Sequence, residues 1–141
     1  MPMNPVSTMD TFEGSMPAID AYNRIVDLAA TKRIITKAAD YTCLAEESGA
    51  VYTATTGIVT FTLPAVTNTG WHAWFVSKVD ETMTVAGVAG TVIADGDAAA
   101  NSIAFSTGAH KIGGMCEMCS DGSKWLILQA GLLAAVPTIA T

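Results

Sequence analysis

The residues of this 141-residue chain best suited to metal or redox chemistry are its three cysteines and two histidines. The strongest pattern among them is Cys116-Glu117-Met118-Cys119, which has the spacing of half a zinc knuckle. Cys43, His72 and His110 are the side chains available to complete a tetrahedral site. The sequence therefore offers Cys116 and Cys119 as candidate metal ligands.

We nevertheless expect these two thiols to be ordinary strand side chains. No second C-x-x-C or H-x-x-x-H pattern is present. Residues i and i+3 of an extended strand point to opposite faces, so both sulfurs cannot reach one ion. A thioredoxin-like redox motif would need this pattern at the start of a helix, whereas here it precedes a predicted hairpin. We predict free thiols, no metal and no other cofactor.

Acidic side chains gather in predicted turns. Asp95-Gly96-Asp97 could open a calcium loop, but Ala99 occupies the place of the next ligand and no bidentate Glu follows. Asp80 and Glu81 are adjacent acids between two predicted strands, which favours a solvated turn over an acid/base pair. The chain also lacks the common nucleophile, metalloprotease, phosphate-loop and dinucleotide patterns. We predict that the protein is not an enzyme and has no small-molecule substrate.

Three tryptophans could form a platform for sugars, which leaves a carbohydrate-binding module open as an alternative. All three lie in apolar predicted strands, and strand alternation places Trp71 and Phe75 on one face with Trp74 on the other. A strand that is apolar on both faces is central in a two-layer fold or buried against a neighbouring subunit. We therefore predict that Trp71, Trp74, Phe75 and Trp125 lie in the core or in a subunit interface.

Short strands separated by turn residues dominate the chain beyond Asp40. The predicted strands cover residues 41–44, 50–53, 58–63, 71–77, 82–86, 91–94, 102–105, 115–120 and 124–128. Asp121-Gly122, between the last two, is the strongest hairpin signal in the chain. The spacing of about ten residues predicts an all-β fold, namely a single antiparallel sandwich, jelly roll or small barrel of about nine short strands.

The first 37 residues differ from this body. They contain Pro2, Pro5 and Pro17 and show no strand-like alternation, which predicts an extended arm or, alternatively, a disordered tail. Helical spacing predicts a short helix over residues 20–30, with extended backbone at 33–36. We divide the chain into an arm (1–37), a β domain (38–129) and an apolar tail (130–141). The arm carries the basic residues Arg24, Lys32, Arg33 and Lys37, whereas the body is acidic.

The composition excludes several classes of partner. The net charge is -6 and the pI is about 4.6, which argues against binding to nucleic acid or to an anionic membrane. The longest uncharged stretch, residues 48–77, is rich in Thr and broken by Pro64 and Gly70, so we expect no membrane span; we also expect no signal peptide. Only 14% of the residues are charged while 50% are hydrophobic. The surface must therefore consist of Thr, Ser, Gly, Ala and Asn, or else much of the apolar surface is covered by other subunits, and the second option indicates an oligomer.

Four segments together resemble a recurrent β-rich domain of tailed-bacteriophage virions. They are Ala39 to Tyr52 (ADYTCLAEESGAVY), Val59 to Pro64 (VTFTLP), the hydrophobic strand Trp74-Phe75-Val76 and the hairpin Ser120 to Trp125 (SDGSKW). The resemblance covers residues 38–129, and the motifs mark structure rather than catalysis. The group contains capsid decoration (cement) proteins, head fibres and tail-fibre modules, which usually assemble as homotrimers.

The resemblance implies a structural virion protein that is made in the host cytoplasm and lies on the capsid surface. One compact domain with one arm favours a decoration protein over a fibre, which needs a shaft or a receptor-binding tip. We expect a homotrimer that binds the major capsid protein through Arg24, Lys32, Arg33 and Lys37 and stabilises the assembled head against internal DNA pressure. A head-fibre or tail-fibre module, acting as an adaptor or binding host glycans, is the alternative.

Overall fold

The computed structural model describes residues 21, 23, 31–94, 96–106, 111–131 and 138–141. Chain contacts divide the protein into residues 1–32 and residues 33–141. The predicted helix over residues 20–30, together with Arg24, lies outside the described residues except for Ala21 and Asn23, both of which are helical.

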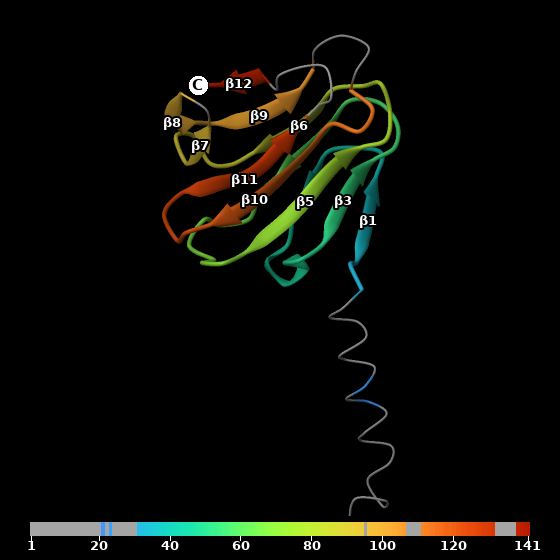
Figure 1. Cartoon of the computed structure of the whole chain (residues 1–141), viewed down its shortest axis with the longest axis horizontal. Helices are drawn as coiled ribbons and strands as arrows, with labels where there is room; N and C mark the ends of the chain where they lie inside the picture. The colour runs from blue at the N-terminus through green and yellow to red at the C-terminus, as the bar shows by residue number, and fades with distance from the viewer. Residues whose placement is uncertain (1–20, 22, 24–30, 95, 107–110, 132–137) are drawn as a thin grey trace, which may run out of the picture. The chain divides into compact units, whose positions relative to one another are not determined.

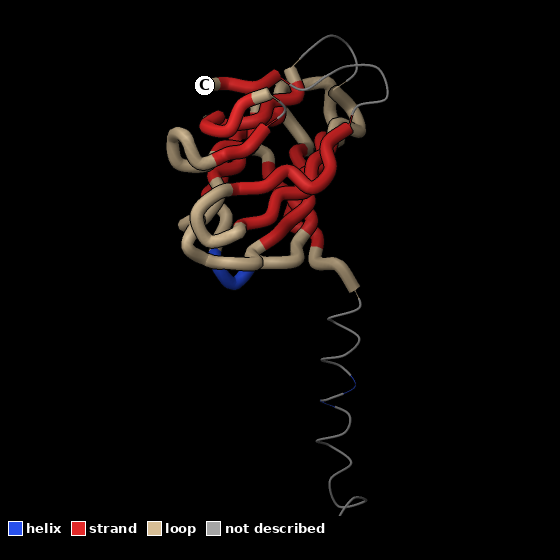
Figure 2. The backbone as a smooth tube through the Cα atoms, turned by 60° about the vertical axis from the view of Figure 1, so that its left-hand side comes forward, coloured by secondary structure: helices blue, strands red, loops and turns tan. Residues whose placement is uncertain are grey.

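This second unit is an all-β sandwich of two sheets, which confirms the predicted fold class (Figure 1). Sheet A has seven strands in the order β1 (Ile34–Lys37), β3 (Val51–Ala54), β5 (His72–Ser77), β10 (Met115–Ser120), β11 (Trp125–Gly131), β7 (Val92–Ala94) and β8 (Asp97–Ala100). Sheet B has five strands in the order β12 (Thr138–Ala140), β9 (Ser102–Phe105), β6 (Met83–Ala86), β4 (Val59–Thr62) and β2 (Tyr41–Thr42). The short 3-10 helix η1 (Ala45–Glu47) lies at one end of the sandwich (Figure 2).

The predicted antiparallel arrangement is wrong, because both sheets are mixed. From β1 to β7 the chain alternates between the sheets, placing odd-numbered strands in sheet A and even-numbered strands in sheet B. Two crossings return the chain to the same sheet in the same direction, so β1, β3 and β5 are parallel to one another, as are β2, β4 and β6. Antiparallel pairs appear later, where β10 pairs with β5 and β11, and β9 pairs with β6 and β12.

Each of the predicted strands overlaps an observed one, but both domain boundaries need correction. The predicted arm ended at Lys37, whereas Ile34–Lys37 is the edge strand β1, held at its ends by bonds from Val51 N–H to the Arg33 carbonyl (2.8 Å) and from Thr55 N–H to the Lys37 carbonyl (3.1 Å). The predicted tail began at residue 130, whereas β11 continues to Gly131 and β12 pairs with β9. Strand β8 was also missed, because its sequence Asp-Ala-Ala-Ala has little intrinsic preference for strands.

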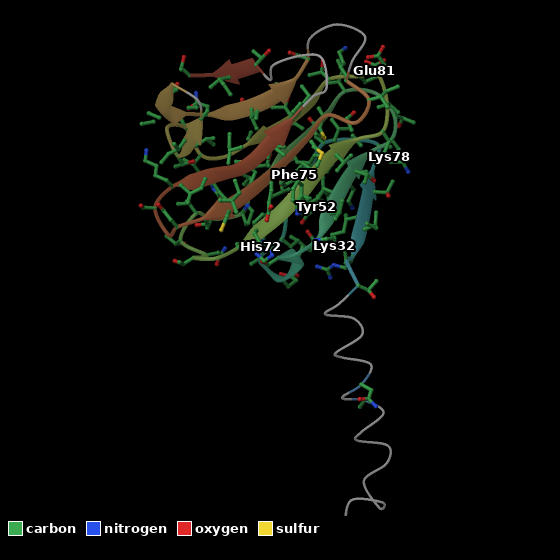
Figure 3. The ribbon with its side chains drawn as sticks, viewed as in Figure 1. Lys32, Tyr52, His72, Phe75, Lys78 and Glu81 are labelled. Carbon is green, nitrogen blue, oxygen red and sulfur yellow. The ribbon has the colours of Figure 1, made fainter. Side chains whose placement is uncertain are left out.

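The core lies between the two sheets and consists of the alternate side chains of each strand that point inward. Tyr52 stacks on Phe75 with ring centroids 5.0 Å apart, and Phe61 of sheet B packs against both rings at 5.4 Å. Trp71 and Trp125 meet edge to face at 5.5 Å. Figure 3 shows Tyr52 and Phe75 near the centre of the sandwich, with His72 and Lys78 toward opposite ends of it.

The predicted hairpin at Asp121-Gly122 is confirmed. An Asp121 side-chain oxygen accepts bonds from the N–H groups of Ser123 (2.8 Å) and Lys124 (2.6 Å), and it thereby closes the turn between β10 and β11. Gly122 has φ +98, and a Cβ at this position would lie 2.6 Å from Thr69 Oγ1. Glycine is therefore required here both by backbone conformation and by space.

Candidate functional site

The structure resolves the aromatic residues into two groups. Trp71, Phe75 and Trp125 are at most 3% exposed and belong to the core of a single chain. Trp74 is half-buried and lies on the outer face of β5, opposite the inward-facing Phe75. Trp71, Phe75 and Trp125 are therefore core residues, whereas Trp74 faces away from the core.

The two cysteines of the C-x-x-C pattern lie on opposite faces of β10, as strand alternation predicts. Cys116 is fully buried, and this burial raises the pKa of its thiol, whereas Cys119 is half-buried on the outer face. Among the residues that the structure describes, no group of three His, Cys, Asp or Glu side chains is arranged to hold a metal ion. His110 lies outside the described residues.

Two of the basic residues predicted to contact a capsid have partners within the chain. The Arg33 guanidinium donates to the Glu46 carbonyl at 3.1 Å, and the Lys37 ammonium lies 3.7 Å from the centroid of the Tyr41 ring. Lys32 is exposed. Arg33 therefore contacts η1 and Lys37 contacts β2, an internal role that sequence reasoning did not assign to them.

The most densely connected polar group surrounds Glu47, a carboxylate that is only 8% exposed. One Glu47 oxygen accepts a bond from the Tyr41 hydroxyl (2.8 Å), and the other accepts bonds from the Tyr52 hydroxyl (2.6 Å) and the Leu44 N–H (2.9 Å). We call these four residues the Glu47 cluster. Tyr41 lies in β2 and Tyr52 in β3, so the carboxylate joins sheet B to sheet A.

The electrostatics of this cluster favour a structural role over a chemical one. Burial alone would raise the pKa of Glu47, but the bonds from Tyr52, Leu44 and Tyr41 outweigh it and the pKa is lowered. Burial and the bond to Glu47 raise the pKa of Tyr52, and burial raises the pKa of the nearby Cys43 thiol to about 12. At neutral pH the carboxylate is ionised with its oxygens occupied, so it is a poor general base, and the thiol is protonated.

Sequence reasoning did not single out the Glu47 cluster. All of its members fall within Ala39 to Tyr52. Tyr41, Glu47 and Tyr52 have no spacing that links them in a helix or strand, since the β2–η1–β3 path brings them together.

The outer face of sheet A is the largest apolar surface that the register defines. Side chains that alternate with the buried ones meet across β1, β3, β5, β10, β11 and β7. We call this surface the apolar face. Its apolar members are Ile34, Val51, Trp74, Val76, Met115, Cys119, Leu126 and Ile93, and its polar members are Thr36, His72, Glu117 and the buried Thr53. We add Leu128, which is 56% exposed and lies at the bulge of β11, where the register gives it no partner.

The outer face of sheet B has a different character. Its outward positions form a flat array of small side chains, which we call the threonine face, and it consists of Thr42, Thr60, Thr62, Thr84, Ala86, Ser102, Ala104, Thr138 and Ala140. The register places Thr60 beside Thr84 and Thr62 beside Ala86. Neither a charged nor a large apolar residue interrupts these described positions.

A shallow depression of about 280 Å³ lies near η1, lined by Ala45, Ser48, Asn68, Thr69, Gly70 and Trp71. The Trp71 ring is nearly buried and its Nε1 donates to the Leu44 carbonyl at 3.1 Å, so the ring offers no open stacking surface. The depression therefore lacks the aromatic platform on which a sugar site usually depends.

No protein-family model matches this sequence, and no curated protein matches it significantly. Within the described part of the chain, no helix is long and apolar enough to cross a bilayer.

Proposed function

We propose that this protein is a structural component of a tailed-bacteriophage virion, a homotrimeric decoration protein that binds the outer surface of the assembled head. The observation that carries the proposal is the character of the two broad faces of the sandwich. One face is apolar and the other consists of small neutral side chains, and Glu117 and His72 are their only titratable members apart from Cys119. An exposed apolar face is typical of proteins that are covered by other protein in their working state.

The Glu47 cluster supports a non-enzymatic role. Its carboxylate is saturated with internal hydrogen bonds, and the neighbouring Cys43 thiol is buried. The cluster lies in the segment that resembles phage virion domains, where it stiffens the end of the sandwich and joins the two sheets. A rigid module held by such contacts suits a protein that reinforces a shell by binding its assembled form.

Two of the four basic residues predicted to contact the capsid have partners within the described part of the chain. Since Arg33 and Lys37 have internal partners, Arg24 and Lys32 are the remaining members of the predicted set. Cations on an otherwise acidic protein give a directional attraction to an acidic patch on the major capsid protein. The head-fibre or tail-fibre alternative lacks a comparable observation, because the depression near η1 has no open aromatic surface.

Binding to undecorated heads of the encoding phage tests this function. The full-length protein should co-sediment with heads saturably and raise the temperature at which they rupture. Reversing charge at Arg24 and Lys32 (both to Glu) should weaken binding, whereas the same change at Lys78 and Lys111 should not. Absence of binding to intact heads by the unmodified protein would overturn the proposal.

A further inference from the structure

We infer that the apolar face is the contact surface between copies of this chain. The inference deepens the proposed function, on whose self-association it rests, by naming the surface and its occupant. The threonine face, the sheet edges and the end near η1 are then left for other contacts.

The outward side chains of sheet A are neighbours across adjacent strands. Ile34 lies beside Val51, Val51 beside Trp74, and Trp74 beside Glu117, so one row of side chains crosses β1, β3, β5 and β10. A second row runs from His72 through Cys119 and Leu126 to Ile93 on β7. Apolar side chains therefore meet across the sheet in three groups, with Glu117 and His72 between them. The groups are Ile34–Val51–Trp74, Val76–Met115 and Cys119–Leu126–Ile93.

Several large side chains of the apolar face are exposed in the single chain. Leu128 is 56% exposed, Ile34 is 58% exposed and Ile93 is 38% exposed. Trp74, Val51 and Leu126 are half-buried between these neighbours. Large side chains thus stand at both margins of the face and flank a wide aromatic ring, an arrangement typical of the apolar centre of an interface.

The area of the apolar face can be compared with that of known interfaces. The face extends over about five strand spacings of about 4.8 Å and, along β5, over about five residues of about 3.3 Å, which is a plan area on the order of 400 Å². This area lies in the range of about 300–600 Å² that the largest apolar patch of a typical monomer has, and such patches are often functional. A partner in a stable complex buries about 800 Å², so the apolar face has the size of the central part of such an interface.

Charge identifies the occupant as a second copy. The chain carries a net charge of -6, so two copies repel unless they meet where acids are scarce. Glu117 is the single carboxylate on the apolar face. An uncharged surface gives no attraction to a basic or acidic partner, whereas the other copies of the proposed homotrimer bring matching uncharged surfaces.

The test is sedimentation velocity across a concentration series for matched variants of the full chain. Leu128→Lys places a charge on the apolar face, while Ile58→Lys and Val88→Lys place it on exposed aliphatic residues outside the face, 66% and 65% exposed respectively. All three sites are exposed, so each variant should fold, and circular dichroism checks this. Leu128→Lys should weaken association by at least about tenfold, and the two controls should leave it unchanged.

Two results overturn the inference, and both differ from failure of the proposed function. If the unmodified protein stays monomeric at every concentration, the face does not join copies. If it associates and Leu128→Lys associates equally well, another surface is the interface. Binding to heads is measured separately, so a protein that self-associates through this face but ignores heads would reject only the decoration role.

Discussion

At the scale of single residues, Glu47 joins the two sheets through one buried carboxylate. It accepts three hydrogen bonds, from β2, from β3 and from the segment between them. A buried charge is tolerated only when it is bonded in this way. Sequence reasoning could not find the cluster, because its tyrosines are brought together by the path of the chain rather than by local spacing.

Adjacent glutamates give a matched test of the Glu47 cluster. Glu47→Gln removes the charge that strengthens all three hydrogen bonds, and we expect the free energy of unfolding to fall by about 1–3 kcal/mol. Glu46→Gln changes an exposed neighbour and should have an effect within about 0.5 kcal/mol. Urea unfolding at one protein concentration measures both, and equal losses would contradict the assigned role.

The lowered pKa of Glu47 also predicts the sign of an acid effect. The unfolded state takes up a proton near the ordinary value of 4.5 while the folded state resists it, so this group stabilises the fold above that pH. Its contribution should disappear as the pH falls below about 4.5 and through the folded-state pKa. The difference in unfolding free energy between the unmodified protein and Glu47→Gln should shrink on acidification, and a constant difference would argue against this linkage.

At the scale of elements, the positions of the strands were predictable and their directions were not. The alternation of Val59, Phe61 and Leu63 with Thr60 and Thr62 matches the observed burial of β4, and β5 is two-faced as predicted. Alternation says nothing about whether the next strand returns to the same sheet. The crossing between sheets, which makes β1, β3 and β5 parallel, is set by long-range packing.

Two glycines with positive φ separate backbone strain from crowding. Gly122→Ala should destabilise the protein by more than Gly96→Ala, because a Cβ at residue 122 meets Thr69 Oγ1 at 2.6 Å while residue 96 has open space around it. The Gly96 change should cost about 1 kcal/mol from backbone strain alone. Adding Thr69→Ala to Gly122→Ala should recover part of the loss. Thermal unfolding of these three variants and of the unmodified protein measures this, and no recovery would show that crowding is not the cause.

The two faces of β10 predict a difference in thiol reactivity. Cys119 faces outward, whereas Cys116 faces the core with a raised pKa. In the Leu128→Lys variant, where the apolar face should be uncovered, Cys119 should be alkylated much faster than Cys116 or Cys43. Mass spectrometry of a timed iodoacetamide reaction gives the order, and equal rates at residues 116 and 119 would contradict the strand orientation.

At the scale of the whole molecule, we propose that the apolar face joins copies of the acidic body and that the basic N-terminal residues contact the capsid. The composition indicated an oligomer because charges are few, and the register shows where those charges are missing. Sequence reasoning placed Trp71 and Trp125 in core or interface without distinguishing them, since burial within one chain and burial between chains need the same residue types.

The contact between copies and the contact with heads, both proposed above, should respond differently to salt. Contact between copies through the apolar face should persist or strengthen as sodium chloride is raised, because charge repulsion between acidic bodies is screened. Binding to heads through Arg24 and Lys32 should weaken under the same conditions. Sedimentation of the protein alone and with heads gives both curves, and parallel loss of the two would argue that one charged surface serves for everything.

The measurement that tests the central claim most directly is the solution mass of the unmodified chain by light scattering over a concentration series. The account predicts a particle of three copies of the 14.6 kDa chain, with dissociation only on dilution. A particle of 14.6 kDa at every concentration would contradict it, because the apolar face would then remain open to water in the native protein.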